Sequence, residues 1–304
     1  CRTEDDLIRE CADARIVVYF GNDLPFTERV LDRMTECLLI QRVAIGFDSV
    51  DVEAATERGI IVSNSAGYCT EEVAVQALAM LLACNQQIPW HQQNLRKGKW
   101  YVVPDPPTER LSEQTLGIVG LGRIGGMLCR RAKHLVARVL AYDPYLTSEQ
   151  FAEIGAEQVD FETILAESDL LSLNCPLTAE TRGLIDAEAL SKMKPTAVLV
   201  NTARGPVVEI DALYDALANR RLRGAGLDVY PIEPPPLPLH SLFSLPNVIT
   251  TPQSAAGSRS SLVDLWRVAS EGVTSVLKGQ LPETIVNPEV ESRLLAGVGK
   301  VRKV

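Results

Sequence analysis

The sequence lacks the features that mark nucleic-acid binding, membrane insertion or secretion. Among its 304 residues, 30 Lys and Arg stand against 39 Asp and Glu, a formal net charge of −9. This acidic balance argues against nucleic acid or an anionic membrane surface as partner, because binding to either needs clustered basic side chains. The longest apolar stretch, residues 73–84, is interrupted by Gln76 and is shorter than the roughly 20 residues of a membrane span. The acidic opening of the chain argues against a signal peptide.

Cysteines are few and scattered. The seven stand at positions 1, 11, 37, 69, 84, 129 and 175, and no two form a C-x-x-C pair. This spacing predicts neither a zinc site nor a disulfide framework, so no bound metal is expected. Reduced thiols in a cytoplasmic protein are the simplest interpretation. The one basic cluster, formed by Lys300, Arg302 and Lys303, is interpreted as a solvated tail.

Alternating apolar and amphipathic segments predict an α/β protein. The length suggests about two domains at roughly 150 residues each, and strands that alternate with helices imply parallel sheets. Strands are predicted at 15–20, 37–44, 60–63, 116–119, 138–142, 169–173, 197–201, 225–229 and 248–250. Helices are predicted at 7–12, 26–34, 50–58, 70–82, 123–135, 161–167, 187–193, 209–220 and 260–277, with a polar connecting arm at 86–108. The six strands from residue 116 onward are the number expected of a doubly wound nucleotide-binding fold.

The strongest local signal is a G-x-G-x-x-G motif made by Gly120, Gly122 and Gly125, between a predicted strand and a predicted helix. The first glycine permits a tight turn, the second lets the backbone approach a pyrophosphate, and the third lets the helix pack on the strand. The helix N-terminus offers amide donors to the phosphates. Asp143 ends the next predicted strand, where a carboxylate binds ribose hydroxyls and repels a 2′-phosphate. The pattern therefore favours NAD over NADP.

A proline-rich segment, PIEPPPLP at 231–238, is incompatible with a helix or a central strand. A stiff loop at an active site is favoured over a polyproline ligand for another domain, because the segment contains Glu233, an acid of the kind that catalysis uses.

Several ordered motifs together make a pattern: GFDSVD (46–51), ATERGI (55–60), TEEVA (70–74), TLGIVGLGRIG (115–125), YDPYL (142–146), CPLTAETRGLI (175–185), LVNTARG (199–205), GLDVY (226–230) and LPNVITTP (245–252). They resemble the NAD-dependent D-isomer-specific 2-hydroxyacid dehydrogenases, most closely their C-terminal-binding-protein-like branch. The resemblance implies a Rossmann-type doubly wound parallel sheet over 68–255, inserted in a smaller flavodoxin-like α/β substrate domain over 1–67 and 256–304. It also implies NAD as cofactor, a small 2-oxo or 2-hydroxy acid as substrate, a homodimer, and a further strand and helix before residue 1.

The resemblance assigns catalytic roles to three positions. Arg204 corresponds to the arginine that binds the substrate carboxylate and carbonyl, and Glu233 to the glutamate that pairs with a histidine. That histidine belongs to a T-P-H pattern, but this chain has Gln253 at the position. A glutamine side chain does not titrate, so Gln253 cannot act as general acid or base. The backbone amides of Ile45 and Gly46 correspond to donors for the substrate carboxylate.

The resemblance assigns the remaining cofactor contacts along the chain. Asp228 corresponds to the aspartate that bonds the nicotinamide carboxamide, and Thr70 lies near the nicotinamide. Asn174 stands where a histidine is common. The other expected cofactor residues are Gly120, Gly122, Arg123, Ile124, Gly125, Asp143, Pro176, Leu177, Thr181, Thr202 and Ala203.

Gln253 leaves several functions open. The leading prediction is a NAD-dependent oxidoreductase with impaired or altered chemistry, and the alternative is a NAD(H)-binding sensor or scaffold with little turnover. Chemistry without a proton relay, or a deliberate replacement that traps a complex, would also fit. The three histidines, His91, His134 and His240, are not expected to replace the missing group.

Overall fold

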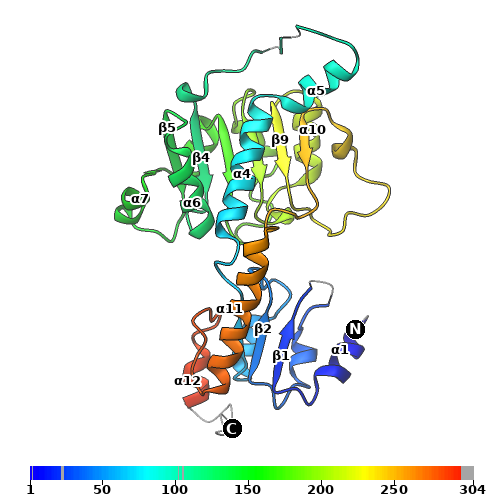
Figure 1. The fold of residues 1–304 in the computed structure, drawn as a ribbon, viewed down its shortest axis with the longest axis vertical. Coiled ribbons are helices and arrows are strands. Elements are labelled where there is room, and N and C mark those ends of the chain that lie inside the picture. The colour runs from blue at the N-terminus through cyan, green and yellow to red at the C-terminus, as the bar shows by residue number, and fades with distance from the viewer. Residues whose placement is uncertain (2, 22–23, 102, 105, 296–304) are drawn as a thin grey trace. The chain divides into compact units, whose positions relative to one another are not determined.

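The computed structural model describes residues 1, 3–21, 24–101, 103–104 and 106–295 (Figure 1). The basic cluster Lys300, Arg302 and Lys303 lies outside them. The chain forms two compact units: Cys1–Cys69 with Ser258–Val304, here the terminal unit, and Thr70–Gly257, here the central unit. The crossings at residues 69 and 257 lie two residues after the predicted boundaries at 67 and 255.

The central unit is built on one parallel sheet of seven strands. Their order is β10-β9-β8-β7-β4-β5-β6, and every neighbouring pair is parallel. The strands are β4 (Thr115–Val119), β5 (Arg138–Tyr142), β6 (Glu157–Gln158), β7 (Leu170–Leu173), β8 (Val198–Asn201), β9 (Gly224–Leu227) and β10 (Val248–Thr250). The order turns back at β4, which gives the doubly wound Rossmann-type arrangement. The prediction of six strands missed β6, a two-residue exposed edge strand with no apolar signal.

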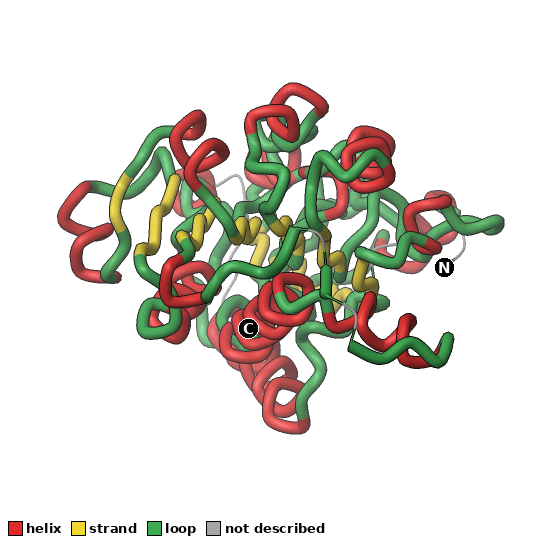
Figure 2. The backbone as a smooth tube through the Cα atoms, turned by 90° about the horizontal axis from the view of Figure 1, so that it is seen from above, coloured by secondary structure: helices red, strands yellow, loops and turns green. Residues whose placement is uncertain are grey.

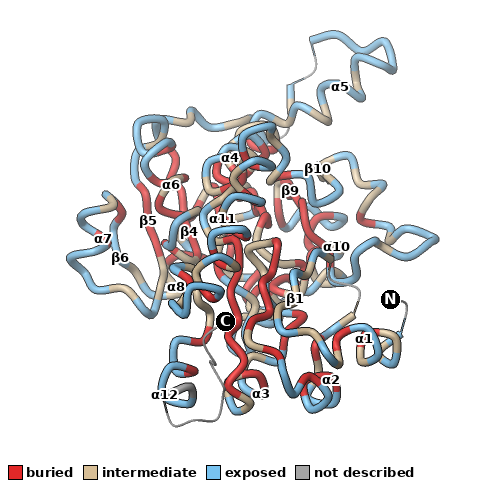
Figure 3. The backbone as a smooth tube through the Cα atoms, turned by 60° about the horizontal axis from the view of Figure 1, so that its bottom comes forward, coloured by how far each residue is buried: buried red, intermediate tan, exposed pale blue. Residues whose placement is uncertain are grey.

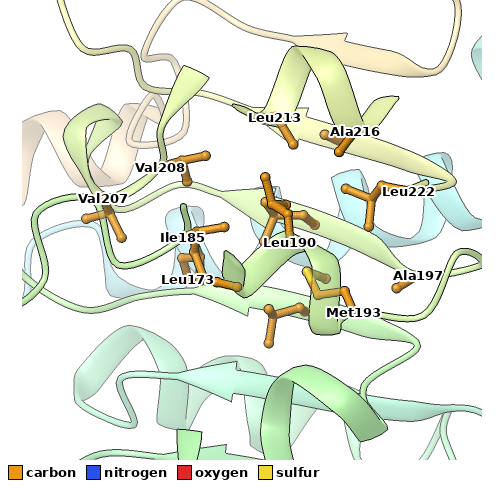
Figure 4. Packing of buried hydrophobic residues seen from close by; sticks show 14 of the residues in the cluster. Leu173, Ile185, Leu190, Met193, Ala197, Val207, Val208, Leu213, Ala216 and Leu222 are labelled. Carbon is orange, nitrogen blue, oxygen red and sulfur yellow. The ribbon is translucent and has the colours of Figure 1, made fainter. Parts of the chain in front are cut away.

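The strands bury both faces. Within β8, Val198 and Val200 join one apolar cluster while Leu199 joins the other, as the two-residue period of a strand requires. Helices cover each face (Figure 2): α4 (Thr70–Asn85) and α6 (Arg123–Ala132) belong to one cluster, and α8 (Phe161–Glu167), α9 (Ala187–Lys192) and α10 (Ile210–Ala218) to the other. Figure 4 shows the second cluster, where Leu190 and Leu213 from two helices meet Leu173 from the sheet.

Helix α4 lies close against the sheet. It contacts β7, β8, β9 and β10, and a Cβ added to Gly226 on β9 would stand 2.9 Å from the Cβ of Met80. The helix begins at Thr70, the first residue of the predicted range 70–82, and acidic side chains occupy its first turn. These carboxylates stabilise the positive end of the helix dipole.

Three helices were not predicted. Helix α5 (Ile88–Arg96) lies within the predicted arm, begins with a proline in its first turn and buries none of its residues, so it lacks the apolar stripe that sequence reading relies on (Figure 3). Helix α7 (Ser148–Ile154) carried readable signals, a capping box at Thr147 and a left-handed Gly155 at its end. Helix α12 (Val290–Leu295) has only six residues.

The terminal unit has a three-stranded parallel sheet in the order β1-β2-β3. Its elements are α1 (Glu4–Cys11), β1 (Ile16–Tyr19), α2 (Glu28–Leu31), β2 (Leu39–Arg42), α3 (Val52–Glu57), β3 (Ile61–Ser63), α11 (Arg259–Leu277) and α12. Buried Asn287 joins the C-terminal segment to this sheet by accepting from Val62 N (2.8 Å) and donating to Ile60 O (3.0 Å). Over the described residues, no helix combines the length and apolarity needed to cross a membrane.

Candidate active site

The predicted cofactor and catalytic residues of the central unit follow the carboxyl ends of neighbouring strands. Gly120 follows β4, Asp143 follows β5, Thr202 follows β8 and Asp228 follows β9. Because the strands are parallel, these ends share one edge of the sheet, and ligands of open α/β sheets bind at that edge. The fold therefore brings residues that span more than 100 positions of the sequence to one edge of the sheet.

The glycine-rich loop has the close packing that its sequence predicted. Gly120 has φ +86°, and a Cβ there would stand 2.7 Å from the amide nitrogen of Cys175. A Cβ on Gly125 would overlap the carbonyl oxygen of Gly120. Gly122 differs, since nothing lies within 4 Å of its added Cβ. Gly120 and Gly125 therefore leave no room for a side chain, whereas the space beside Gly122 is open. Arg123 and Ile124 follow Gly122 and begin α6.

Asp143 supports this loop directly. Its Oδ2 accepts from Leu121 N (2.9 Å) and its Oδ1 accepts from Tyr145 N (3.1 Å). A carboxylate has about four acceptor positions, so two remain for ribose hydroxyls. The prediction gave Asp143 a ribose-binding role only; the structure adds that it fixes the backbone of the glycine-rich loop.

The Arg204 turn is shaped by Asn201, which sequence reasoning missed. Buried Asn201 accepts from Ala203 N (3.0 Å) and donates to the Arg204 carbonyl (2.9 Å). This is the Asx-turn geometry that an asparagine after a strand can form. It holds Arg204 half-buried at the end of β8, with its guanidinium donating to Ala203 O (2.7 Å).

The next residue joins this turn to the proline-rich loop. A Cβ on Gly205 would overlap the carbonyl group of Tyr230 and stand 2.5 Å from Pro231 N. Tyr230 is buried, donates from its hydroxyl to Thr251 O (2.9 Å), and packs against Phe243. Burial, followed by the nearby Asp228 carboxylate, raises the pKa of Tyr230 to about 12. Tyr230 was another residue missed from the sequence.

Asp228 organises the loop that carries Gln253. Its side chain is buried and accepts from the Thr251 hydroxyl, from Ser254 N (2.9 Å) and from Ala255 N (3.0 Å). Its carbonyl accepts from Gln253 N (2.9 Å). From α4, Gln76 donates to the Thr251 hydroxyl oxygen (3.4 Å). Asp228 thus determines the course of the loop after β10, in addition to the carboxamide role predicted for it.

Gln253 and Glu233 are not joined by a hydrogen bond. Glu233 is exposed and its Oε1 accepts from Tyr230 N (2.9 Å). Gln253 is exposed, with its backbone in the left-handed region at φ 51°. His240 binds Asp211 on α10 (3.0 Å) and caps a short 3-10 helix, so it serves a structural purpose.

Two buried polar atoms at the strand ends have no hydrogen-bond partner within the described chain. They are Thr202 Oγ1, after β8, and Asn174 Oδ1, after β7. Such orphans are costly unless a ligand or water satisfies them, so they fit a bound group with its own donors, as ribose and carboxamide have. Thr181 differs: its hydroxyl donates to Pro176 O (2.6 Å) and closes the turn that also contains Leu177.

In the terminal unit, the loop after β2 presents two amides. Gly46 O accepts from buried Arg42 (3.2 Å) and Ile45 O accepts from Asn64 (2.7 Å). The amides of Ile45 and Gly46 donate no hydrogen bond to the described residues. Their carbonyls are thus fixed while their donors are available to an anion.

Comparison with known proteins identifies the family. Residues 78–255 match the family described as "D-isomer specific 2-hydroxyacid dehydrogenase, NAD binding domain". The chain belongs to this family.

The chain is similar to two proteins whose names state an enzymatic activity. A glyoxylate reductase of Korarchaeum cryptofilum is 39% identical over 287 residues, 93% of this chain and 86% of that one. A D-3-phosphoglycerate dehydrogenase of Archaeoglobus fulgidus is 37% identical over 95% of this chain, which spans only 54% of that protein. The chain therefore covers about half the length of the phosphoglycerate dehydrogenases it matches.

The fold of the family is shared with solved structures. D-lactate dehydrogenase from Aquifex aeolicus, solved with NAD and lactic acid, superposes with a TM-score of 0.84 at 30% sequence identity. The match covers 92% of this chain and 88% of the Aquifex aeolicus chain. The glycine-rich loop and the strand-end residues described above thus belong to a NAD binding domain of the 2-hydroxyacid dehydrogenases.

Proposed function

We propose that the protein is a NAD-dependent oxidoreductase that transfers a hydride between nicotinamide and C2 of a 2-oxo or 2-hydroxy acid. The observation that carries the proposal is the built turn at the end of β8, where Asn201 holds Arg204 on the same sheet edge as the glycine-rich loop. The names of the similar proteins, a glyoxylate reductase and a D-lactate dehydrogenase, support this substrate class.

Bound NAD would supply or accept the hydride. Gly120 and Gly125 allow the backbone to approach its pyrophosphate, and Thr202 and Asn174 offer it unsatisfied oxygens. The planar Arg204 guanidinium suits a carboxylate and the charge that develops on the substrate oxygen. The amides of Ile45 and Gly46 are proposed as carboxylate donors.

The proton has no titratable carrier at position 253. A positioned acid or base contributes typically about 10²–10⁴-fold, so its loss slows the reaction without removing hydride transfer. Gln253 can donate a hydrogen bond to the substrate oxygen, and water then supplies the proton. Glu233, which lies on the loop packed against Gly205, is proposed to assist by its charge.

A NAD(H)-binding sensor or scaffold is the second candidate, in keeping with the C-terminal-binding-protein-like branch. Gln253 favours it, because a glutamine amide at the acid/base position cannot take up or release a proton. Binding of NADH without turnover on any 2-oxo acid would distinguish this function from the first.

We also propose a homodimer. Helix α5 buries none of its residues, and Ile88, Leu95, Trp100 and Tyr101 are between 55% and 94% exposed. A second copy that covers this arm would remove the apolar surface from water. Sedimentation of the whole chain tests this, and a monomer at high concentration would contradict it.

The deciding experiment follows NADH oxidation with glyoxylate, pyruvate, hydroxypyruvate and phenylpyruvate, for the chain and for Gln253→His in parallel. We expect the variant to be faster by about tenfold or more, because it restores a group that titrates near neutral pH. Turnover by neither protein, with NADH bound by both, would contradict the oxidoreductase and support the sensor.

A further inference from the structure

A tyrosine joins two loops at the sheet edge. Tyr145 lies just after β5, and its hydroxyl donates to Glu180 Oε2 (2.9 Å) in the loop after β7. Strands β5 and β7 are the two neighbours of β4 in the sheet. The bond therefore links the loops on either side of the strand that leads into the glycine-rich turn.

Glu180 is held on a firm support. Its neighbour Thr181 donates to Pro176 O (2.6 Å) and accepts from Thr178 N (2.8 Å), and Arg182 N donates to Thr178 O (3.1 Å). These bonds close the 176–182 turn on itself. The carboxylate at its tip is then positioned by the tyrosine.

The same tyrosine also contacts the other acid of this region. Tyr145 N donates to Asp143 Oδ1 (3.1 Å), so one residue bonds two carboxylates through its two ends. Both carboxylates, Glu180 first, raise the pKa of the tyrosine. Across the described residues neither Asp143 nor Glu180 forms a salt bridge, so no basic side chain pairs with either carboxylate.

We propose that Glu180, positioned by Tyr145, is a second determinant of NAD over NADP. Asp143 would bind the ribose hydroxyls, and Glu180 would add negative charge beside the place where a 2′-phosphate would have to lie. The inference rests on the proposed ribose role of Asp143. Asp143 already accepts hydrogen bonds from Leu121 and Tyr145, so only part of its acceptor capacity is left for the ribose. Glu180 would add to the discrimination that Asp143 provides.

The test is equilibrium binding of NADH and NADPH, measured by nicotinamide fluorescence without substrate. For Glu180→Gln we expect NADPH to bind about two- to fivefold more tightly and NADH to change little, the size typical of one exposed charge. The gain should fade at about 0.5 M salt, where charges are screened within a few ångströms. Glu180→Asp, which keeps the charge, should keep most of the discrimination.

Asp215→Asn is the matched control. It removes the same charge from an exposed position late in α10, and that helix leads back to the amino end of β9, away from the cofactor edge. We expect no change in the NADH to NADPH ratio. Tyr145→Phe should relax the ratio part of the way, because it releases the Glu180 carboxylate.

The outcomes separate the two assignments. Equal weakening of both dinucleotides by Glu180→Gln, or an unchanged ratio, would overturn the role of Glu180. An unchanged ratio in Asp143→Ala would overturn the ribose assignment beneath it. Relaxation by Asp143→Ala without any effect of Glu180→Gln would leave the ribose assignment intact and remove Glu180 alone.

Discussion

Gly205 offers the sharpest test of how the Arg204 turn and the proline-rich loop are joined. An alanine Cβ there would stand 2.5 Å from Pro231 N and closer still to the Tyr230 carbonyl. Non-bonded atoms are most stable at about 3.5–4.0 Å, so the two backbones must separate by about 1 Å or more. Both partners are backbone atoms, and neither can turn aside as a flexible side chain can.

The cost follows from that displacement. Overpacking of this kind typically costs about 1–3 kcal/mol. At about 2 kcal/mol, the melting temperature of a unit this size should fall by about 4–8 °C. Because misplacement by about 1 Å can cost roughly 10²-fold in rate, turnover should fall by about that factor in any variant that is active.

Gly126→Ala serves as the matched control. Gly126 lies inside α6, where an added Cβ has its nearest contact at 3.5 Å from the Arg130 guanidinium. Alanine in a helix interior is favoured over glycine by roughly 0.5–1 kcal/mol, so this variant should melt about 1–4 °C higher. Scanning calorimetry measures both variants, and a Gly205→Ala protein as stable and active as the parent would refute the close packing.

Three further predictions follow from the same structure. Arg204→Ala should abolish whatever 2-oxo acid turnover is measured while NADH affinity stays nearly unchanged; a raised NADH dissociation constant would place Arg204 in cofactor binding instead. At pH 8 one thiol, Cys1, should react quickly with a disulfide reagent and all seven in denaturant, because the other six are buried and burial raises the pKa of Cys37, for example, to about 12. Burial raises the pKa of Tyr230 from 10 to about 12, so its neutral form is favoured in the fold. The stability that the neutral Tyr230 side chain contributes should be complete below pH 10 and lost between pH 10 and 12, by up to about 3 kcal/mol; an unfolding series in which Tyr230→Phe shows the same loss would contradict this.

The fold was predictable where side-chain period carries the information. Strands such as β8, buried on both faces, appear as continuous apolar runs, and the glycine spacing marks the first turn of α6. Exposed α5 and the two-residue β6 carry no such pattern, because neither buries an apolar stripe. Their place in the chain depends on tertiary contacts and on local turns.

The motifs predict which residues form the site, and these assignments remain predictions, whereas the hydrogen bonds around those residues could not be predicted. The motifs located Arg204 and Asp228, yet not the asparagine turn that holds the one or the three donors that occupy the other. Those bonds join residues more than 20 positions apart in the case of Asp228. They exist because β8, β9 and β10 end side by side, which is a property of strand order.

The position of Gln253 is set by backbone bonds and not by its own side chain. Its backbone amide donates to Asp228 O, and Thr251 and Ser254, on either side of Pro252 and Gln253, donate to the Asp228 carboxylate. None of these bonds involves the side-chain amide of Gln253. The left-handed φ at this position is tolerated by several polar residues at modest cost. The loop should therefore keep its course with histidine in place of Gln253, so a failure of that variant to gain turnover would be a statement about chemistry and not about folding.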